Sequence, residues 1–236
     1  MSNAGIFYGI GVGPGDPELL TVKAINTIQK VDTIIAPKTE KKDDSLALSI
    51  VKPHLKKDVE IVYQTFPMVK DFSDTAAETW QANKSEILER IKAGKNVAFL
   101  TLGDPLFFST FIYIFELLTK EKIRIELIPG IPAFLAIASR IQKPVVYGDE
   151  VLSIIPATAD LDKIDHALKN SDASILMKVY KNFPEIVDVL EKNDFIDEAV
   201  LISRCGLKDE KRIDDLKSHT DEKLNYLSTI QTRRQP

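Results

Sequence analysis

Short apolar runs alternate along this chain with longer stretches in which apolar residues recur at helical spacing. An apolar run over 6–12 leads into glycines and prolines, and helical spacing follows over 19–28. The runs at 33–37 and 96–102 are almost wholly apolar, which is typical of parallel strands buried on both faces. This alternation predicts an α/β fold. Further helices are expected at 46–51, 74–91 and 108–119, the last one buried, and further strands at 59–62 and, near a sheet edge, at 123–128.

The second half continues the alternation without repeating the sequence of the first. We expect two packed α/β domains, residues 1–130 and 131–236, because no Gly/Ser-rich linker separates them and each half is of ordinary domain size. A ligand cleft is expected between the two domains. The second half is expected to contain strands at 151–155, 173–178, 199–203 and 224–230, with helices at 131–141, after Asp160 and after Asn182.

Glycines and prolines are concentrated in the segment GIGVGPGDP over 9–17, between the first strand and the first helix. Such a loop at the carboxyl end of a parallel strand is where open α/β sheets hold ligands. The spacing also fits a phosphate or dinucleotide loop, or a plain tight turn. Asp16 would repel an anion at the start of the helix, so a ligand with hydroxyl groups or a positive charge suits this loop better.

A second acidic loop, Gly103-Asp104-Pro105, follows the apolar run at 96–102. Gly103 permits close approach of the backbone, and Asp104 can accept hydrogen bonds from sugar hydroxyls. The alternative is an aspartate that caps a helix with proline in its first turn. Two such loops after two strands favour a binding site.

Composition narrows the classes of function. Of the 236 residues 44% are hydrophobic and 28% charged, and a net charge of -4 disfavours nucleic acid as a partner. No protein-bound metal is expected, because there is one cysteine, Cys205, and the histidines at 54, 166 and 219 lack ligand spacing. No signal peptide or membrane span is recognised, so we expect a cytoplasmic protein without a membrane partner.

Six segments together resemble the tetrapyrrole methyltransferases, a two-domain class that uses S-adenosylmethionine. They are GIGVGPGDPELLTVKA, TLGDPLFFSTF, ELIPGIPAF, SIIPAT, ILMK and LNYLSTI, in the family's order over nearly the whole chain. The most similar branch methylates carbon 20 of precorrin-2 or cobalt-factor II in cobalamin biosynthesis. Alternatives are uroporphyrinogen III, another corrinoid precursor, or a macromolecule such as ribosomal RNA or a modified protein histidine. A further alternative is a tetrapyrrole-binding module without catalysis.

The resemblance implies that S-adenosylmethionine lies between the domains and is converted to S-adenosylhomocysteine. Pro132 departs from the Thr or Ser of many relatives, which leaves only backbone contacts there, and Phe108 replaces a common Tyr. The positions that match the family's cofactor binders are Pro14, Leu102, Gly103, Asp104, Phe107, Pro132, Ala133, Ala157, Met177 and Gly206.

The family's substrates carry several acetate and propionate groups, which require basic partners. An electron-rich meso carbon can attack the methyl group directly, so catalysis can rest on holding two molecules in register. Candidate acceptors of the proton released afterwards are Asp104 and Tyr8, with solvent as the alternative. The resemblance also implies a homodimer, and any cobalt would arrive in the substrate. The hypothesised carboxylate anchors are Lys38, Lys41, Lys42, Lys70, Lys178 and Arg204.

Overall fold

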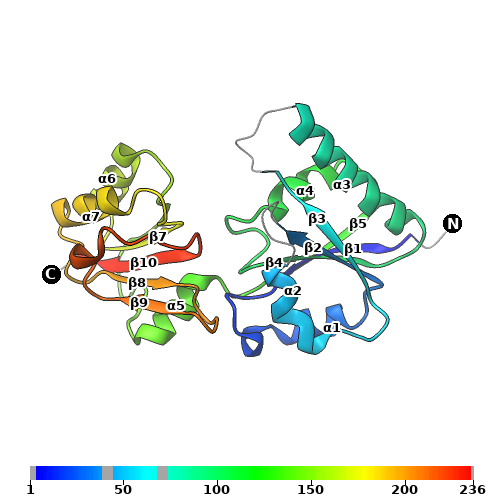
Figure 1. The fold of residues 1–236 in the computed structure, drawn as a ribbon, viewed down its shortest axis with the longest axis horizontal. Coiled ribbons are helices and arrows are strands. Elements are labelled where there is room, and N and C mark those ends of the chain that lie inside the picture. Colours follow the sequence, from blue (N-terminus) through cyan, green and yellow to red (C-terminus); the bar gives the residue numbers. More distant parts are fainter. Residues whose placement is uncertain (1–3, 39–44, 68–73, 235–236) are drawn as a thin grey trace. The chain divides into compact units, whose positions relative to one another are not determined.

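The computed structural model describes residues 4–38, 45–67 and 74–234. The chain divides into two compact units, Met1–Pro132 and Ala133–Pro236, and each contains a five-stranded sheet with helices on both faces (Figure 1). The α/β class expected from the sequence is confirmed. The division falls two residues after the boundary drawn from the sequence.

The sheet of the first unit is parallel throughout and has the strand order β3-β2-β4-β1-β5. The apolar run at 96–102 forms the central strand β4, with four buried residues in a row, and the alternating run at 123–128 forms the edge strand β5, as predicted. The strands are β1 (Ile6–Gly11), β2 (Thr33–Lys38), β3 (Glu60–Thr65), β4 (Val97–Thr101) and β5 (Arg124–Ile128).

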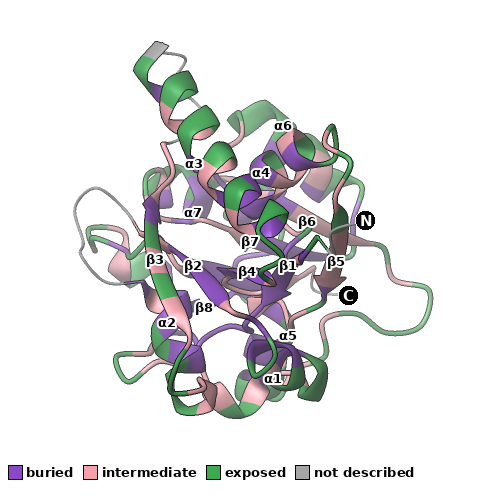
Figure 2. Ribbon diagram, turned by 90° about the vertical axis from the view of Figure 1, so that its right-hand side faces the viewer, coloured by how far each residue is buried: buried purple, intermediate pink, exposed green. Residues whose placement is uncertain are grey.

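Two hydrophobic clusters cover the two faces of this sheet. Helices α1 (Val22–Ile28) and α2 (Leu46–Val51) pack on the face that contains Ile10 and Leu100. Helices α3 (Asp74–Lys92) and α4 (Phe111–Leu118) pack on the opposite face. Figure 2 shows the buried residues concentrated in the central strands and on the inner sides of these helices.

Two helices of the first unit begin later than the apolar pattern predicts. Helix α1 begins at Val22, because Pro17–Leu19 forms a separate 3₁₀ turn and the Thr21 hydroxyl caps α1 by accepting a hydrogen bond from the Ala24 amide at 3.1 Å. Helix α4 begins at Phe111, because Phe108 has a φ of 48°, outside the helical range. Only three residues of α4 are buried, so the expectation of a helix buried all round was wrong.

The sheet of the second unit has the order β6-β7-β10-β8-β9, in which only β6 and β7 are parallel. One core cluster packs α6 and α7 against one face, and α5 contacts β10. The elements are α5 (Ala133–Ile141), β6 (Leu152–Pro156), α6 (Leu161–Lys169), β7 (Ala173–Met177), α7 (Phe183–Lys192), β8 (Val200–Ser203), β9 (Lys211–Ile213) and β10 (Ser228–Arg233).

Several details of this unit differ from the expectations. Strand β7 ends at Met177 because Lys178 has a φ of 64°, and β10 begins at Ser228, four residues after the expected start. Strand β9 was not predicted, because its three residues are too few for a hydrophobic pattern. Across the described parts of both units, no helix is long and apolar enough to cross a membrane.

Candidate active site

The carboxyl ends of β1 and β4 mark a topological switch point in the first sheet. These strands are neighbours, yet β1 continues into α1 on one face and β4 into α4 on the other. Connections that leave neighbouring strands toward opposite faces open the crevice in which α/β sheets bind ligands. Both glycine-containing loops identified in the sequence begin at this point.

Glycines bring three loops into direct backbone contact there. Gly13 and Gly103, with φ angles of 75° and 64°, exchange hydrogen bonds: the Gly103 amide donates to the Gly13 carbonyl at 2.8 Å, and the reverse bond measures 3.3 Å. A Cβ on Gly130, after β5, would lie 2.1 Å from the Gly103 oxygen and 2.8 Å from the Gly11 Cα. No side chain fits between these loops, so glycine is required at Gly130.

The two acidic residues of the loops accept hydrogen bonds from backbone amides. Asp16 Oδ1 accepts from the Glu18 amide at 2.9 Å and caps the 3₁₀ turn. Asp104 Oδ1 accepts from the Leu106 amide at 2.9 Å, and its Oδ2 accepts from the Gly130 amide at 3.1 Å. The capping alternative therefore describes part of what Asp104 does. Its second oxygen ties the β4 loop to the β5 loop.

The segment after Asp104 returns tightly to the sheet. The hydroxyls of Thr101 and Ser109 lie 2.7 Å apart, and the Ser109 oxygen accepts from the Phe111 amide at 3.0 Å. Between these anchors Phe108 has a left-handed backbone, which for a bulky residue costs about 1–3 kcal/mol. Leu106 is 51% exposed and Phe108 39%. The loop thus holds apolar side chains at the surface beside the switch point.

The charges of the three loops decide which ligands they fit. Residues 12–17, 102–109 and 128–133 contain two carboxylates and no lysine or arginine. A phosphate would meet negative charge without a compensating cation. A sulfonium with a nucleoside and no phosphate fits this set of donors, acceptors and close backbones.

In the second unit, three more predicted positions lie at or just after the carboxyl ends of three strands of one sheet, β6, β7 and β8. The buried Ala157 donates its amide to the Met177 carbonyl at 2.7 Å, which joins the ends of β6 and β7. After β8, Gly206 has a φ of 77°, and its amide donates to Glu210 Oε2 at 2.6 Å. Because that amide is used within the loop, a ligand would contact the Cα or the carbonyl of Gly206.

The sequence model of the tetrapyrrole (corrin/porphyrin) methylase family matches residues 7–218 of this chain. The chain belongs to this family. This tetrapyrrole methylase is 34% identical over 232 residues to the cobalt-precorrin-2 C(20)-methyltransferase of Salmonella typhimurium, covering 98% of this chain and 97% of that one. It is 35% identical to the probable cobalt-precorrin-2 C(20)-methyltransferase of Methanocaldococcus jannaschii, with 96% and 95% covered.

Solved structures show the same fold for the methylase. A cobalt precorrin-4 methyltransferase superposes with a TM-score of 0.75 at 19% identity, over 97% of this chain and 94% of the other. A uroporphyrin-III C-methyl transferase from Thermus thermophilus, solved in complex with S-adenosyl homocysteine, gives a TM-score of 0.69 at 18% identity, over 96% and 97%.

The predicted cofactor positions of the methylase fall into two groups. The first unit brings together the residues of three neighbouring loops, and Gly103 lies against Pro132, whose Cα would be 3.8 Å from an added Cβ. The second unit holds the rest, with Ala133 as the first residue of α5. The first group is Pro14, Leu102, Gly103, Asp104, Phe107 and Pro132, and the second is Ala133, Ala157, Met177 and Gly206.

The structure describes three of the six hypothesised substrate anchors. Lys38 ends β2, at the same edge of the first sheet as the glycine loops, while Lys178 and Arg204 directly follow β7 and β8 in the second sheet. Lys41, Lys42 and Lys70 lie outside the described residues.

Tyr8 lies in the middle of β1 and packs against the α1/α2 core cluster, three residues before the strand ends. Burial, and then the nearby charge of Glu126, raise the pKa of Tyr8, which keeps the phenol protonated near neutral pH. A protonated phenol within the sheet is poorly suited to accept a proton.

Sequence reasoning missed the close packing of Gly11 and Gly130, although Pro129-Gly130 after an apolar strand was a signal.

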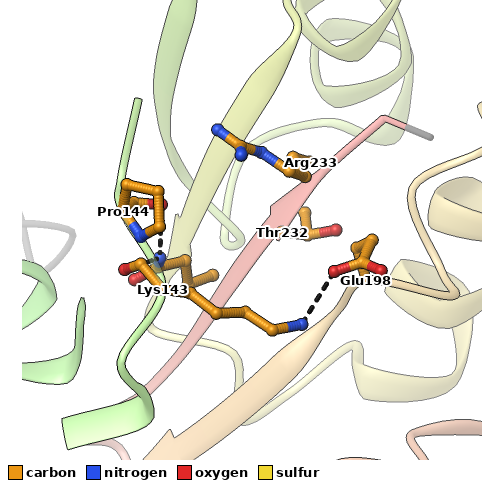
Figure 3. A pocket seen from close by; sticks show the side chains of 6 residues that line it. Lys143, Pro144, Glu198, Thr232 and Arg233 are labelled. Carbon is orange, nitrogen blue, oxygen red and sulfur yellow. Dashed lines mark hydrogen bonds and ion pairs between the residues drawn. The ribbon is translucent and has the colours of Figure 1, made fainter. Parts of the chain in front are cut away.

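A pocket of about 140 Å³ lies at the end of the second sheet opposite to the carboxyl ends of β6, β7 and β8 (Figure 3). There β10 ends opposite the start of β7, whereas Met177 and Lys178 lie at the end of β7. Lys143 and Glu198 neutralise each other across 2.7 Å in this pocket. No group of three or more potential metal-ligating side chains occurs within residues 4–38, 45–67 and 74–234. The pocket is lined by Lys143, Pro144, Glu198, Gln231, Thr232 and Arg233.

Proposed function

We propose that this tetrapyrrole methylase transfers a methyl group from S-adenosylmethionine to carbon 20 of precorrin-2 or its cobalt complex, in cobalamin biosynthesis. The observation that carries the proposal is the similarity, over 96–98% of the chain, to relatives named for that reaction. The glycine loops support it, because their charges and close backbones suit a ligand without phosphate.

The residues that would hold the cofactor are the two groups described above, one in each unit. S-adenosylmethionine supplies an electrophilic methyl group on a sulfonium. The chain's contribution is then to bind and orient, because fixing two reactants in register can supply about 7–11 kcal/mol of a barrier. The hydrogen bonds between Gly13, Gly103, Asp104 and Gly130 hold the ends of three strands together, an arrangement that suits that task.

The structure argues against a strong base among the described loop residues. Each oxygen of Asp104 already accepts a backbone amide hydrogen bond, so both oxygens are used to hold the loops together. Tyr8 is protonated and part of the sheet. We therefore assign proton removal after methyl transfer to solvent and give Asp104 a positioning role.

The decisive test is methyl transfer by the purified protein. Incubation with S-adenosylmethionine carrying a ¹³C methyl group and with precorrin-2 or cobalt-factor II should add one methyl group, seen as a single mass increment. The label should appear at carbon 20 in the ¹³C spectrum. Parallel reactions with metal-free and cobalt-loaded rings decide which form is the substrate.

The same experiment separates the alternatives. Methylation of uroporphyrinogen III in place of both precorrin-2 forms would keep the enzyme class and replace the substrate. Tight porphyrinoid binding with no binding of S-adenosylhomocysteine would indicate a binding module without catalysis. Absence of any mass gain on precorrin-2-type rings rejects the proposed reaction.

A homodimer and a cytoplasmic location belong to the proposal as well. Apolar side chains that remain exposed in the second unit support an interface between copies, namely Val146, Tyr147 and Val151 at 37%, 61% and 53%. Light scattering of the eluting protein should give twice the 26.4 kDa mass of one chain. A mass equal to one chain at micromolar concentration would contradict the dimer.

A further inference from the structure

Two cationic residues occupy equivalent, strained positions at one edge of the second sheet. Lys178 follows the last residue of β7 with a φ of 64°, and Arg204 follows the last residue of β8 with a φ of 56°. Both have side chains that disfavour the left-handed region. Such a conformation persists only where surrounding structure imposes it, and it is concentrated at functional sites.

The entry into β10 imposes both conformations. Strand β10 lies between β7 and β8, and its first residue and the residue before it bond to both turns. The Val179 amide donates to the Ser228 carbonyl at 3.2 Å, and the Arg204 amide donates to the Leu227 carbonyl at 2.9 Å. The two cations are therefore fixed on either side of one strand. Neighbouring strands are about 4.8 Å apart, so the two backbones are about 10 Å apart.

Contacts of the two side chains keep them at this edge. The Lys178 ammonium lies 6.0 Å from the ring centre of Tyr226, which is 45% exposed and packs edge-on against Tyr180. Arg204 Nε lies 2.6 Å from Asp209 Oδ2, and Asp209 is largely exposed. A guanidinium has five N–H donors, so an ion pair along one side leaves donors for a second carboxylate.

We propose that Lys178 and Arg204 form a preorganised pair that binds two carboxylate groups of one acidic tetrapyrrole, with Tyr226 beside its apolar ring. This inference rests on the proposed function and specifies which groups select the substrate. The spacing of about 10 Å between the two backbones favours two different carboxylates of one molecule over a single carboxylate shared by both cations. Of the anchors hypothesised from the sequence, these two carry the observations that mark a built site.

The test measures binding of uroporphyrin, a stable porphyrin with eight carboxylates, by fluorescence quenching. Lys178→Ala and Arg204→Gln should each weaken binding about tenfold, the usual effect of losing one hydrogen bond between charged groups. Calorimetric affinity for S-adenosylhomocysteine should stay within twofold of wild type. Lys181→Ala and Lys208→Ala remove exposed cations nearby that lack the strained backbone, and they should leave uroporphyrin affinity unchanged.

A glycine variant separates a ligand role from a structural one. Lys178→Gly removes the cation and also relieves the left-handed strain, so it should raise the melting temperature while weakening uroporphyrin binding as Lys178→Ala does. Wild-type uroporphyrin affinity in both Lys178→Ala and Arg204→Gln overturns the pair and leaves the proposed methyl transfer standing. If the wild-type protein binds S-adenosylhomocysteine but not uroporphyrin, the pair is rejected, and methyl transfer to precorrin-2-type rings still decides the proposed function.

Discussion

A single methyl group at Gly130 tests whether the three loops must touch. The added Cβ would lie 2.1 Å from the Gly103 oxygen and 2.7 Å from the Gly11 carbonyl carbon. Even favourable carbon–oxygen contacts are about 3.3 Å or longer, so the loops would have to separate by about 1 Å. All of these neighbours are backbone atoms, which cannot move aside as a flexible side chain can.

The expected magnitude follows from the bonds that this separation breaks. Two hydrogen bonds join Gly13 to Gly103, and one joins Asp104 to Gly130. At about 1 kcal/mol each, Gly130→Ala should lower the free energy of unfolding by about 3 kcal/mol. A displacement of about 1 Å in a site can cost a hundredfold in function, so we expect affinity for S-adenosylhomocysteine to fall at least tenfold.

Urea unfolding and calorimetric titration with S-adenosylhomocysteine measure the two effects. Gly148→Ala is the matched control, because Gly148 has a φ of 59° and an added Cβ would meet nothing within 4 Å. That variant should lose about 1 kcal/mol of stability through backbone strain alone and keep its affinity. If Gly130→Ala binds as tightly as wild type and loses less than 1 kcal/mol, the loops separate freely and the backbone contact does not build the site.

Three further substitutions test other parts of the argument. Asp104→Asn replaces one of the two acceptor oxygens with a donor, so the hydrogen bond from either the Leu106 or the Gly130 amide is lost and affinity for S-adenosylhomocysteine should fall about tenfold; unchanged affinity would remove its positioning role. Hydrogen bonds, the largest effect coming from Arg90 and the next from Thr33, lower the pKa of Glu60 from 4.5 to about 2, so its stabilisation is complete above pH 4.5 and is lost as the pH falls toward 2. Because Glu60 is partly exposed, Glu60→Gln should lower the free energy of unfolding by only about 1 kcal/mol at pH 7. Unfolding measured at decreasing pH should show this difference from wild type vanish near pH 2. A difference that stays constant with pH would contradict the assignment. Thr21→Ala removes the cap of α1 and should cost about 1 kcal/mol in urea unfolding, whereas a loss below 0.3 kcal/mol would show that the cap contributes little.

The local hydrophobic pattern alone determined the class of the fold and most of its elements, although not the short strand β9 or every boundary. The buried strand at 96–102 and the edge strand at 123–128 were predictable because a strand buried on both faces is apolar throughout, while an exposed edge alternates. The glycine and acidic residues of the two loops also indicated a ligand without phosphate. These features depend on neighbours in the sequence, and so they can be read from it.

Only the tertiary structure decided what the loop residues contact. Gly130 and Gly103 are 27 positions apart, and only the parallel pairing of β5, β1 and β4 brings their backbones together. The second oxygen of Asp104 finds its partner in the same way. The left-handed turns at Lys178 and Arg204 arise from hydrogen bonds to β10, about 25 to 50 residues further along the chain, which no local pattern contains.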